Sequence, residues 1–195
     1  MCLLHDRKNI FLVGAKAPIN FMKIAIIGAQ GVGKTTLAIQ INEEYPDLKI
    51  LPEAARLAVE AGHKLDHTAT TETELWLIAK QIELENTEGK WVADRCGIDL
   101  LAYIHHLFSK EQALIEFATK TLVSRFSNYD LVLYLPSGEF AIKDDGLRTT
   151  DIKFQQDIDE KVRYILEEHK IPFIEIVGTP DERLAKVKNL IAFTD

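Results

Sequence analysis

Residues 22–36 read MKIAIIGAQGVGKTT, and this stretch decides the fold that the rest of the sequence has to fit. An apolar run leads into Gly28 to Thr35, which match the pattern G-x-x-x-x-G-K-[ST], and a helical pattern follows. Glycines let the backbone wrap a phosphate, so that successive N–H groups and the helix N-terminus point at the anion. The stretch therefore predicts a strand, a phosphate-binding loop and a helix, and with them the binding of a nucleotide.

The loop also predicts how the phosphates and a metal ion would be held. The Lys34 side chain can reach the β- and γ-phosphates, and the Thr35 hydroxyl can ligate Mg²⁺. A second expected Mg²⁺ ligand, directly or through water, is Asp94 at the end of a later apolar run. The residues expected to contact the nucleotide are Gly28, Ala29, Gln30, Gly31, Val32, Gly33, Lys34, Thr35 and Thr36.

Length, composition and charge fit one compact domain. The sequence has 195 residues, 47% of them hydrophobic, which suits one domain over residues 21–195. Because Met22 opens the first expected strand, residues 1–20 are expected to be a poorly ordered extension or an upstream start. The net charge of -7 argues against DNA or RNA polymers, which favour basic surfaces. No apolar run reaches the roughly 20 residues that span a membrane, and Cys2 and Cys96 cannot form a disulfide framework. The sequence thus predicts a cytoplasmic protein without a membrane partner, and it leaves a homodimer open.

Apolar runs alternate with helical patterns from Met22 onward. The expected strands read KIAIIG, LKIL, KWVAD, DLVLYL and PFIEIVG, at residues 23–28, 48–51, 90–94, 130–135 and 172–178. Apolar residues recur at helical spacing in three groups: Leu75, Ile78, Ala79 and Ile82; Ile158, Val162, Ile165 and Leu166; Leu184, Val187, Leu190 and Ile191. This alternation predicts an α/β fold with a parallel sheet covered on both faces. Ligands in such folds bind beyond the carboxyl ends of the strands, where the phosphate-binding loop and Asp94 would both lie.

The residues after the third expected strand decide between a switch and a kinase. Asp94 to Gly97 read D-x-x-G, as in a GTPase switch, whereas Asp94-Arg95 is also the acid–arginine pair of small-molecule kinases. A GTPase needs a guanine-reading N/T-K-x-D after a later strand, and the sequence contains none. A motor-type ATPase would carry a second carboxylate where Arg95 stands. Because an arginine beside phosphates stabilises charge on a transferring group, the pair favours phosphoryl transfer, with a strand-end ion pair as the alternative.

A second cluster fits the site of a phosphate acceptor. Glu53 and Arg56 follow the second expected strand one helical turn apart, so both can face one cleft. Glu53 could take the proton from an acceptor hydroxyl, and Arg56 could hold the acceptor. The alternative is a solvated pair on a helix surface.

The segment KDDGLRTTD, residues 143–151, has the charge, glycine hinge and length of a mobile lid. Arg148 could close on the phosphates, with Asp144 and Asp145 orienting it. A plain solvated loop is the alternative.

The run GTPDER is typical of a helix start. It places Thr179 at the N-cap, Pro180 at the first helical position and Glu182 two positions later, which is a capping box. This structural role is preferred for Thr179, although it is compatible with a contact to the nucleotide base. Cys96 is expected to be a small packed thiol and not a nucleophile.

With these residues assembled, the sequence resembles the P-loop nucleoside- and nucleotide-kinase-like proteins, an AAA-type ATPase-like family. That family includes the ribosylnicotinamide kinase domain of bacterial NAD-biosynthesis regulators. The likeness extends over nearly everything from Met22 onward and rests on GAQGVGKTTLA, PEAAR, LWLIAKQIELE, ADR, DDGLR and EEHKIPFIEIVGTPDERL. Ribosylnicotinamide kinases usually have acidic-Thr-Asp after the third strand, so Asp94-Arg95-Cys96 looks nearer to deoxynucleoside and thymidylate kinases.

The resemblance implies a P-loop three-layer sandwich with five parallel strands in the order 2-3-1-4-5 and a helical lid. It also implies ATP and Mg²⁺ as cofactors and a nucleoside-type small molecule as the substrate. By the same likeness, Glu53 is the acceptor-side carboxylate, Arg95 and Arg148 contact phosphate, and Gln81 reads the acceptor base. Asp145 and Arg56 complete the substrate-side residues.

The sequence therefore predicts an ATP- and Mg²⁺-dependent kinase for a nucleoside or nucleotide. The alternative from another class is a nucleotide-binding regulatory NTPase that cycles between states and has no acceptor. Glu53 and Arg56 separate the two, because a regulator has no need of an acceptor site.

Overall fold

The computed structural model describes residues 22–142 and 149–192, in which strands and helices alternate along the chain. The strands are β1 (Lys23–Ile27), β2 (Lys49–Leu51), β3 (Trp91–Asp94), β4 (Leu131–Tyr134) and β5 (Ile174–Glu175). The α-helices are α1 (Lys34–Glu44), α2 (Ala54–Glu60), α3 (Thr71–Glu85), α4 (Gly97–Leu107), α5 (Gln112–Val123), α6 (Ile152–Glu168) and α7 (Pro180–Ala192). Two short 3₁₀ helices, η1 (Asp66–Thr68) and η2 (Phe126–Asn128), join them.

The five strands form one parallel sheet in the order β2-β3-β1-β4-β5, which confirms the predicted fold class and strand order. The apolar strand β1 lies at the centre, with Ile26 opposite Asp94 of β3 and Leu133 of β4. Because all strands run the same way, β1 and β3 bring their carboxyl ends, and the residues that follow, to one edge of the sheet.

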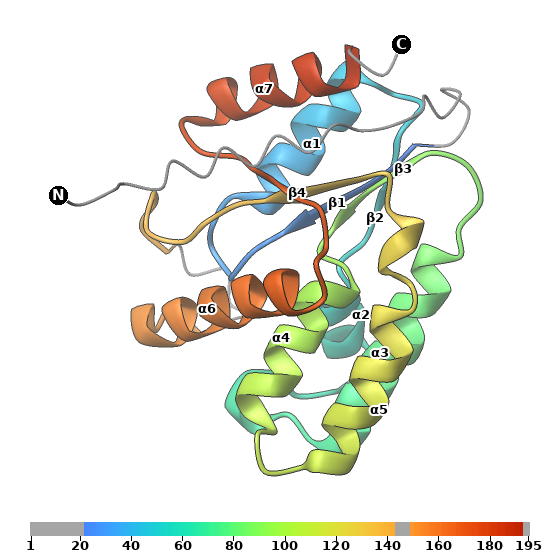
Figure 1. The fold of residues 1–195 in the computed structure, drawn as a ribbon, viewed down its shortest axis with the longest axis vertical. Helices are drawn as coiled ribbons and strands as arrows, with labels where there is room; N and C mark the ends of the chain where they lie inside the picture. The colour runs from blue at the N-terminus through green and yellow to red at the C-terminus, as the bar shows by residue number, and fades with distance from the viewer. Residues whose placement is uncertain (1–21, 143–148, 193–195) are drawn as a thin grey trace, which may run out of the picture.

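Helices cover both faces of the sheet, as the alternating pattern predicts. Figure 1 shows α1 and α7 on one side and α4 and α6 on the other, with α3 and α5 farther out along α4. Strand β1 is accordingly buried on both faces, and Ile24 to Ile27 have no exposed surface. The continuous apolar run at β1 is thus explained by its place between two helical layers.

The buried face of α3 differs from the one predicted from apolar spacing. Ile78 is buried, but Leu75 and Ala79 are exposed. The buried positions of this helix are Thr73, Glu74, Leu77, Ile78, Gln81 and Glu85. Polar side chains occupy the inner face because they border a cavity and an internal hydrogen-bond cluster, so hydrophobic periodicity gave the wrong orientation for this helix.

Strand β5 is shorter than the run 172–178 suggested. Only Ile174 and Glu175 pair with β4. The strand is at the sheet edge, Pro172 has no N–H to donate, and Gly178 turns the chain with a φ of 103°. After that turn Thr179 and Glu182 form the predicted capping box, since each backbone N–H donates to the other residue's side chain.

Three sequence predictions fall beyond the region that the structure describes. They are the extension at residues 1–20, the lid residues Arg148 and Asp145, and the orienting role of Asp144. None of the helices within the described ranges has the length and apolarity to cross a membrane.

Candidate active site

The phosphate-binding loop lies between β1 and α1, where the sequence predicts it. Gly28 has a φ of 141°, and a Cβ atom there would come within 2.3 Å of the Leu135 carbonyl oxygen. Gly33, the N-cap of α1, is left-handed with a φ of 92°. Glycine is therefore required at Gly28 by a neighbouring strand end and at Gly33 by backbone conformation.

Lys34 is folded back over this loop. Its ammonium Nζ donates to the carbonyl oxygens of Gly28, at 2.9 Å, and Ala29, and the side chain is only 5% exposed. Burial lowers the pKa of Lys34 to about 8, with the nearby Arg95 charge acting in the same direction and the carboxylates of Asp99 and Asp94 opposing it. The loop thus contains a buried cation beside backbone N–H groups, as phosphate binding requires.

Thr35 and Asp94 meet at the sheet edge. The Thr35 hydroxyl, in the first turn of α1, donates to Asp94 Oδ2 at the end of β3. Two hard oxygen ligands therefore converge from different elements, and Mg²⁺ needs few protein ligands because it keeps waters and phosphate oxygens. These residues fit the Mg²⁺ site that the sequence predicts.

Arg95 follows Asp94 in a strained backbone conformation. Its φ is 81°, which is uncommon for a residue with a side chain, and its N–H donates to the Ile26 carbonyl oxygen. This conformation turns the side chain inward, where Nε forms an ion pair with Glu53 Oε1 at 2.7 Å and the guanidinium lies 5.3 Å from the Tyr103 ring centroid. Burial opposes the charge, but Tyr103, Glu53 and Asp99 outweigh it and raise the pKa of Arg95 above its ordinary value.

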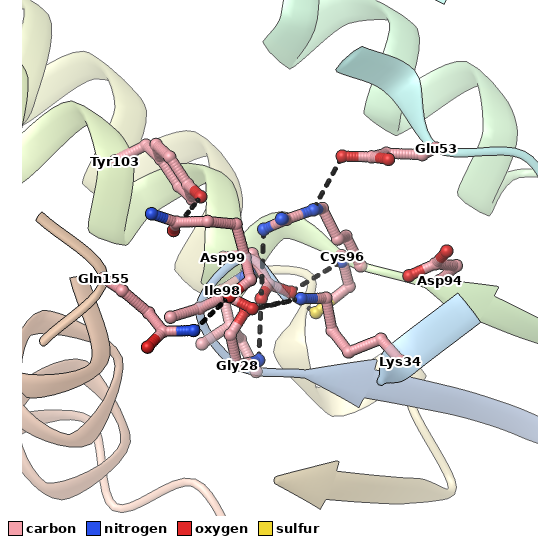
Figure 2. A network of polar contacts seen from close by, with 12 residues as sticks. Gly28, Lys34, Glu53, Asp94, Cys96, Ile98, Asp99, Tyr103 and Gln155 are labelled. Atoms are coloured by element: carbon pink, nitrogen blue, oxygen red, sulfur yellow. Dashed lines mark hydrogen bonds and ion pairs between the residues drawn. The ribbon is translucent and has the colours of Figure 1, made fainter. Parts of the chain in front are cut away.

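Asp99 connects the elements of the site, and sequence reasoning missed it. This carboxylate is 1% exposed and accepts hydrogen bonds from the backbone N–H of Gly28 at 2.9 Å and of Cys96 at 3.0 Å (Figure 2). Arg95 Nη1 lies 3.9 Å from Asp99 Oδ1. Burial raises the pKa of Asp99, while Arg95 and Lys34 act to lower it. One side chain thus ties the phosphate-binding loop to the end of β3 and the start of α4.

Cys96 is the buried thiol that the sequence favoured, and Gly97 follows it at the start of α4. Cys96 is buried at the N-cap of α4, and burial raises the pKa of its thiol well above the ordinary value. The Gly97 N–H donates inward to Glu85 and to the Tyr129 hydroxyl. The Gly97 N–H is thus engaged in the protein interior.

Two cavities open at this edge, and they adjoin. The larger, of about 400 Å³, follows the phosphate-binding loop. It is lined by Gln30, Gly31, Gly33, Lys34, Thr35, Thr36, Leu37, Gln40, Glu53, Arg56, Asp94, Arg95, Phe140, Ala141, Ile142, Thr149, Pro180 and Arg183. The smaller, of about 30 Å³, lies between α2, α3 and α4. It is lined by Glu53, Ala54, Ala55, Leu65, Asp66, Glu74, Leu77, Gln81, Arg95, Cys96, Asp99, Leu100, Tyr103 and Leu107.

Among the described residues, only Glu53 and Arg95 border both cavities. Gln81 borders the small cavity, where an acceptor base was expected. Arg56 forms an ion pair with Glu53 at 3.5 Å but borders the large cavity, so it lies on the phosphate side of the junction. Thr179 is absent from both linings, although Pro180 next to it borders the large one.

Arg183 is another residue that sequence reasoning left out. It is the last residue of GTPDER, and it is 2% exposed. Its Nη1 donates to the Val32 carbonyl oxygen at 2.6 Å, and its Nη2 forms an ion pair with Glu139. The guanidinium lies 4.7 Å from the Phe140 ring centroid. The sequence did offer a signal for Arg183, because it lies one turn into a helix whose start faces the phosphate-binding loop. The capping-box interpretation of GTPDER did not take this arginine into account.

Comparisons with known proteins agree with this architecture. A family model described as an AAA domain matches residues 23–183. A search of curated proteins finds no match. The NadR protein in complex with NR has a TM-score of 0.75 at 19% identity, over 89% of this chain and 52% of that chain. The chain therefore spans about half the length of that NadR protein.

Two kinases match over most of their own length. Deoxyadenosine kinase from M. mycoides has a TM-score of 0.65 at 15% identity, over 88% of this chain and 100% of that chain. Thymidylate kinase from Candida albicans has a TM-score of 0.63 at 19% identity, over 89% of this chain and 92% of that chain. These likenesses confirm the fold expected from the motif resemblance. The chain belongs to the AAA domain family, with the fold of P-loop nucleoside and nucleotide kinases.

Proposed function

We propose that this protein is a kinase that transfers the γ-phosphoryl group of ATP to a nucleoside or nucleotide, with Mg²⁺. The observation that carries the proposal is the junction of the two cavities at Glu53 and Arg95. Phosphoryl transfer needs a donor and an acceptor to meet beside a proton acceptor and a cation. A volume of about 400 Å³ is that of an ordinary small-ligand site, which suits the nucleotide.

Each residue at the junction has a role in this proposal. Lys34 follows the transferring phosphoryl group, and Arg95 Nη1, which is buried without a hydrogen-bond partner among the described residues, donates to it. The acceptor hydroxyl forms the new bond to phosphorus as the bond to the ADP oxygen breaks, and its proton goes to Glu53. Thr35 and Asp94 would hold Mg²⁺, which neutralises charge on the phosphates. Arg148 is proposed to close over the phosphates, with Asp144 and Asp145 orienting it and Asp145 on the substrate side, from the segment beyond the described residues.

The size of the small cavity favours a second candidate, the regulatory NTPase without an acceptor. About 30 Å³ is room for a few water molecules and is far below the roughly 300–1,000 Å³ of a small-ligand site. A nucleoside can therefore bind there only if α2, α3 or the residues between them move outward. If that movement does not occur, the nucleotide cavity alone remains functional, and slow hydrolysis is the reaction to expect.

Replacing Glu53 by glutamine separates the two candidates. A positioned general base contributes about 10² to 10⁴ in rate, so Glu53→Gln should lower acceptor-dependent ADP formation by a factor in that range. ADP release would be measured with a panel of nucleosides and nucleoside monophosphates. A regulatory NTPase predicts instead that no acceptor raises ADP release and that Glu53→Gln leaves basal hydrolysis unchanged.

A matched control is Glu83→Gln, which removes a carboxylate that is ion-paired with Lys80 on the exposed side of α3. This variant should keep the wild-type rate. Glu53 also holds Arg95, so an effect through Arg95 has to be distinguished. Loss of the acidic limb of the pH–rate profile in Glu53→Gln would identify the general base, whereas a uniform decrease at every pH would indicate that Glu53 only positions Arg95.

Nucleotide affinity is expected to fall as the pH rises through 8. Lys34 must be protonated to bind phosphate, and its pKa of about 8 means that it loses its proton in the free protein above that pH. Bound phosphate raises this pKa, so binding above pH 8 takes up a proton and the ATP affinity should drop about tenfold between pH 7 and pH 9. Titration calorimetry in two buffers of different ionisation enthalpy would measure both quantities.

Lys34→Arg is the companion variant for this measurement. An arginine remains charged at every pH in this range, so the affinity should become independent of pH. A wild-type affinity that is equal at pH 7 and pH 9 would contradict the assignment of Lys34 to the phosphates.

We further propose that the enzyme works as a cytoplasmic protein on small molecules, with no nucleic-acid polymer or membrane as a partner. The net charge of -7 and the absence of a disulfide framework support this proposal. A monomer and a homodimer are both compatible with this proposal.

A further inference from the structure

We propose that Glu85 fixes the amide of Gln81 so that the acceptor cavity selects bases that present an amino group over bases that present a carbonyl oxygen. This inference rests on the proposed function and narrows its substrate class. The observations that carry it are the hydrogen bonds of Glu85 and the chemical nature of the groups around the small cavity.

Glu85 lies beneath the cavity at the C-terminal end of α3 and is 3% exposed. Its Oε1 accepts three hydrogen bonds: from Gln81 Nε2 at 2.8 Å, from the Tyr129 hydroxyl at 2.6 Å and from the Gly97 N–H at 3.1 Å. Arg125 Nε lies 3.6 Å from its Oε2. Three donors converge on Oε1, so this oxygen acts as an acceptor and a side chain that bonds to it has to supply an N–H or O–H group.

The orientation of Gln81 follows from this chemistry. An amide has a donor end and an acceptor end, and only the nitrogen end can bond to a carboxylate. Gln81 borders the small cavity, and within the described residues its Oε1 has no hydrogen-bond partner and is not sealed in the protein interior. Gln81 therefore presents its carbonyl oxygen to whatever enters, and turning the amide over would break the bond to Glu85.

Other side chains of the small cavity have the same polarity. Asp66 and Glu74 also line it, and their side chains carry carboxyl oxygens and no N–H donor. The Tyr103 hydroxyl gives its proton to Gln30 Oε1 at 2.9 Å, so its oxygen also faces a ligand as an acceptor. The cation Arg95 borders this cavity only at its junction with the large one, where its Nε forms an ion pair with Glu53.

A base with an amino group suits this lining. The two N–H donors of an amino group can bond to Gln81 Oε1 and to a neighbouring oxygen, as adenine and cytosine allow. A carbonyl oxygen in the same place, as in hypoxanthine or uracil, would meet other oxygens and lose its hydrogen bond to water. Leaving a buried polar group unpaired costs enough to lower kcat/KM roughly 10- to 100-fold.

The test compares matched nucleosides that differ at one exocyclic position. Cytidine against uridine and adenosine against inosine would be measured for kcat/KM in the kinase reaction and for binding by calorimetry. The amino member of each pair should be favoured by roughly tenfold or more. Gln81→Met keeps the length of the side chain and removes its oxygen, so the ratio should shrink toward one.

The matched control is Gln112→Met. Gln112 donates to Glu116 four residues later, as Gln81 does to Glu85, but on the exposed face of α5. It should leave the amino-to-carbonyl ratio unchanged. Equal or better use of uridine and inosine, or an unchanged ratio in Gln81→Met, would overturn the inference while the kinase assignment stands. If none of the four nucleosides or their monophosphates binds or reacts, this inference fails, and the proposed function fails with it only if no member of the wider acceptor panel raises ADP release.

Discussion

Lys34→Ala is expected to abolish phosphotransfer while the fold survives. The ammonium group is buried within the phosphate-binding loop, where its interaction with a developing charge is not weakened by water. Removing one such preorganised donor costs about 10² to 10³ in rate, and a full charge should cost at least that much. The measurement is acceptor-dependent ADP release at saturating ATP.

Removing the Lys34 charge should lower the activity but should not lower the stability of the fold. The pKa of Lys34 is about 8 in the folded protein and near 10.5 in an unfolded chain, so the unfolded chain binds the proton more tightly. The charge therefore costs stability at every pH below about 8, and this cost disappears as the pH rises from about 8 to 10.5. A Lys34→Met variant, which keeps the apolar stem, should melt no lower than wild type at pH 7.

The control for this prediction is Lys188→Ala. Lys188 is half-exposed on α7 and forms an ion pair with Glu44 of α1. This variant should lose neither activity nor more than a few tenths of a kcal/mol of stability, because exposed ion pairs contribute little. Unchanged turnover in Lys34→Ala would remove the loop from the catalytic assignment.

The parts of the fold that could be predicted are those in which local pattern and tertiary role coincide. The run KIAIIG is apolar throughout because β1 is buried on both faces, and its glycine comes where the chain must approach β4. The prediction was wrong for α3, because its buried face includes the polar residues Glu74, Gln81 and Glu85, of which Gln81 and Glu85 are joined by a hydrogen bond. Hydrophobic periodicity cannot detect a helix face that is buried for polar reasons.

The candidate site could be predicted at positions where a sequence motif assigns a residue one specific role. Lys34, Thr35 and Asp94 were placed by motif, and the structure brings them to one sheet edge. Asp99 and Arg183 were not predicted by a motif, because each forms a hydrogen bond to backbone atoms of the phosphate-binding loop, which is distant in sequence. An aspartate in the first turn of a helix looks like an ordinary cap, and only the coordinates reveal its second hydrogen bond to Gly28.

Arg95 combines a feature that the sequence predicted with one that it did not. Its identity followed from the acid–arginine pair, but its left-handed backbone did not, since such a conformation favours glycine. Strain at a site persists when surrounding contacts hold it in place. Here the Ile26 carbonyl oxygen, Glu53 and Asp99 supply those contacts, so the strained backbone is the means by which the guanidinium reaches the junction of the cavities.

Arg95→Lys is expected to lower phosphotransfer by roughly 10²-fold or more while ATP still binds. Lysine keeps the positive charge between Glu53 and Asp99 but lacks the planar fork whose parallel N–H groups can bond to two phosphate oxygens. The measurements are single-turnover transfer, which isolates chemistry, and calorimetric ATP affinity. Arg163→Lys is the matched control, because that arginine forms ion pairs with Asp159 and Glu175 at a half-exposed position.

A second pair of variants separates the guanidinium from the strained backbone. Arg95→Ala keeps the strain and Arg95→Gly relieves it, and both remove the guanidinium that forms ion pairs with the buried Glu53 and Asp99. Losing one partner of a buried pair costs about 3–5 kcal/mol, so both variants should melt lower, with glycine the more stable of the two. If transfer is equally poor in both, the missing guanidinium is the cause. Wild-type turnover in Arg95→Lys and in Arg95→Gly would instead reduce Arg95 to a strand-end ion pair, because the charge and the fork would both have been removed without effect.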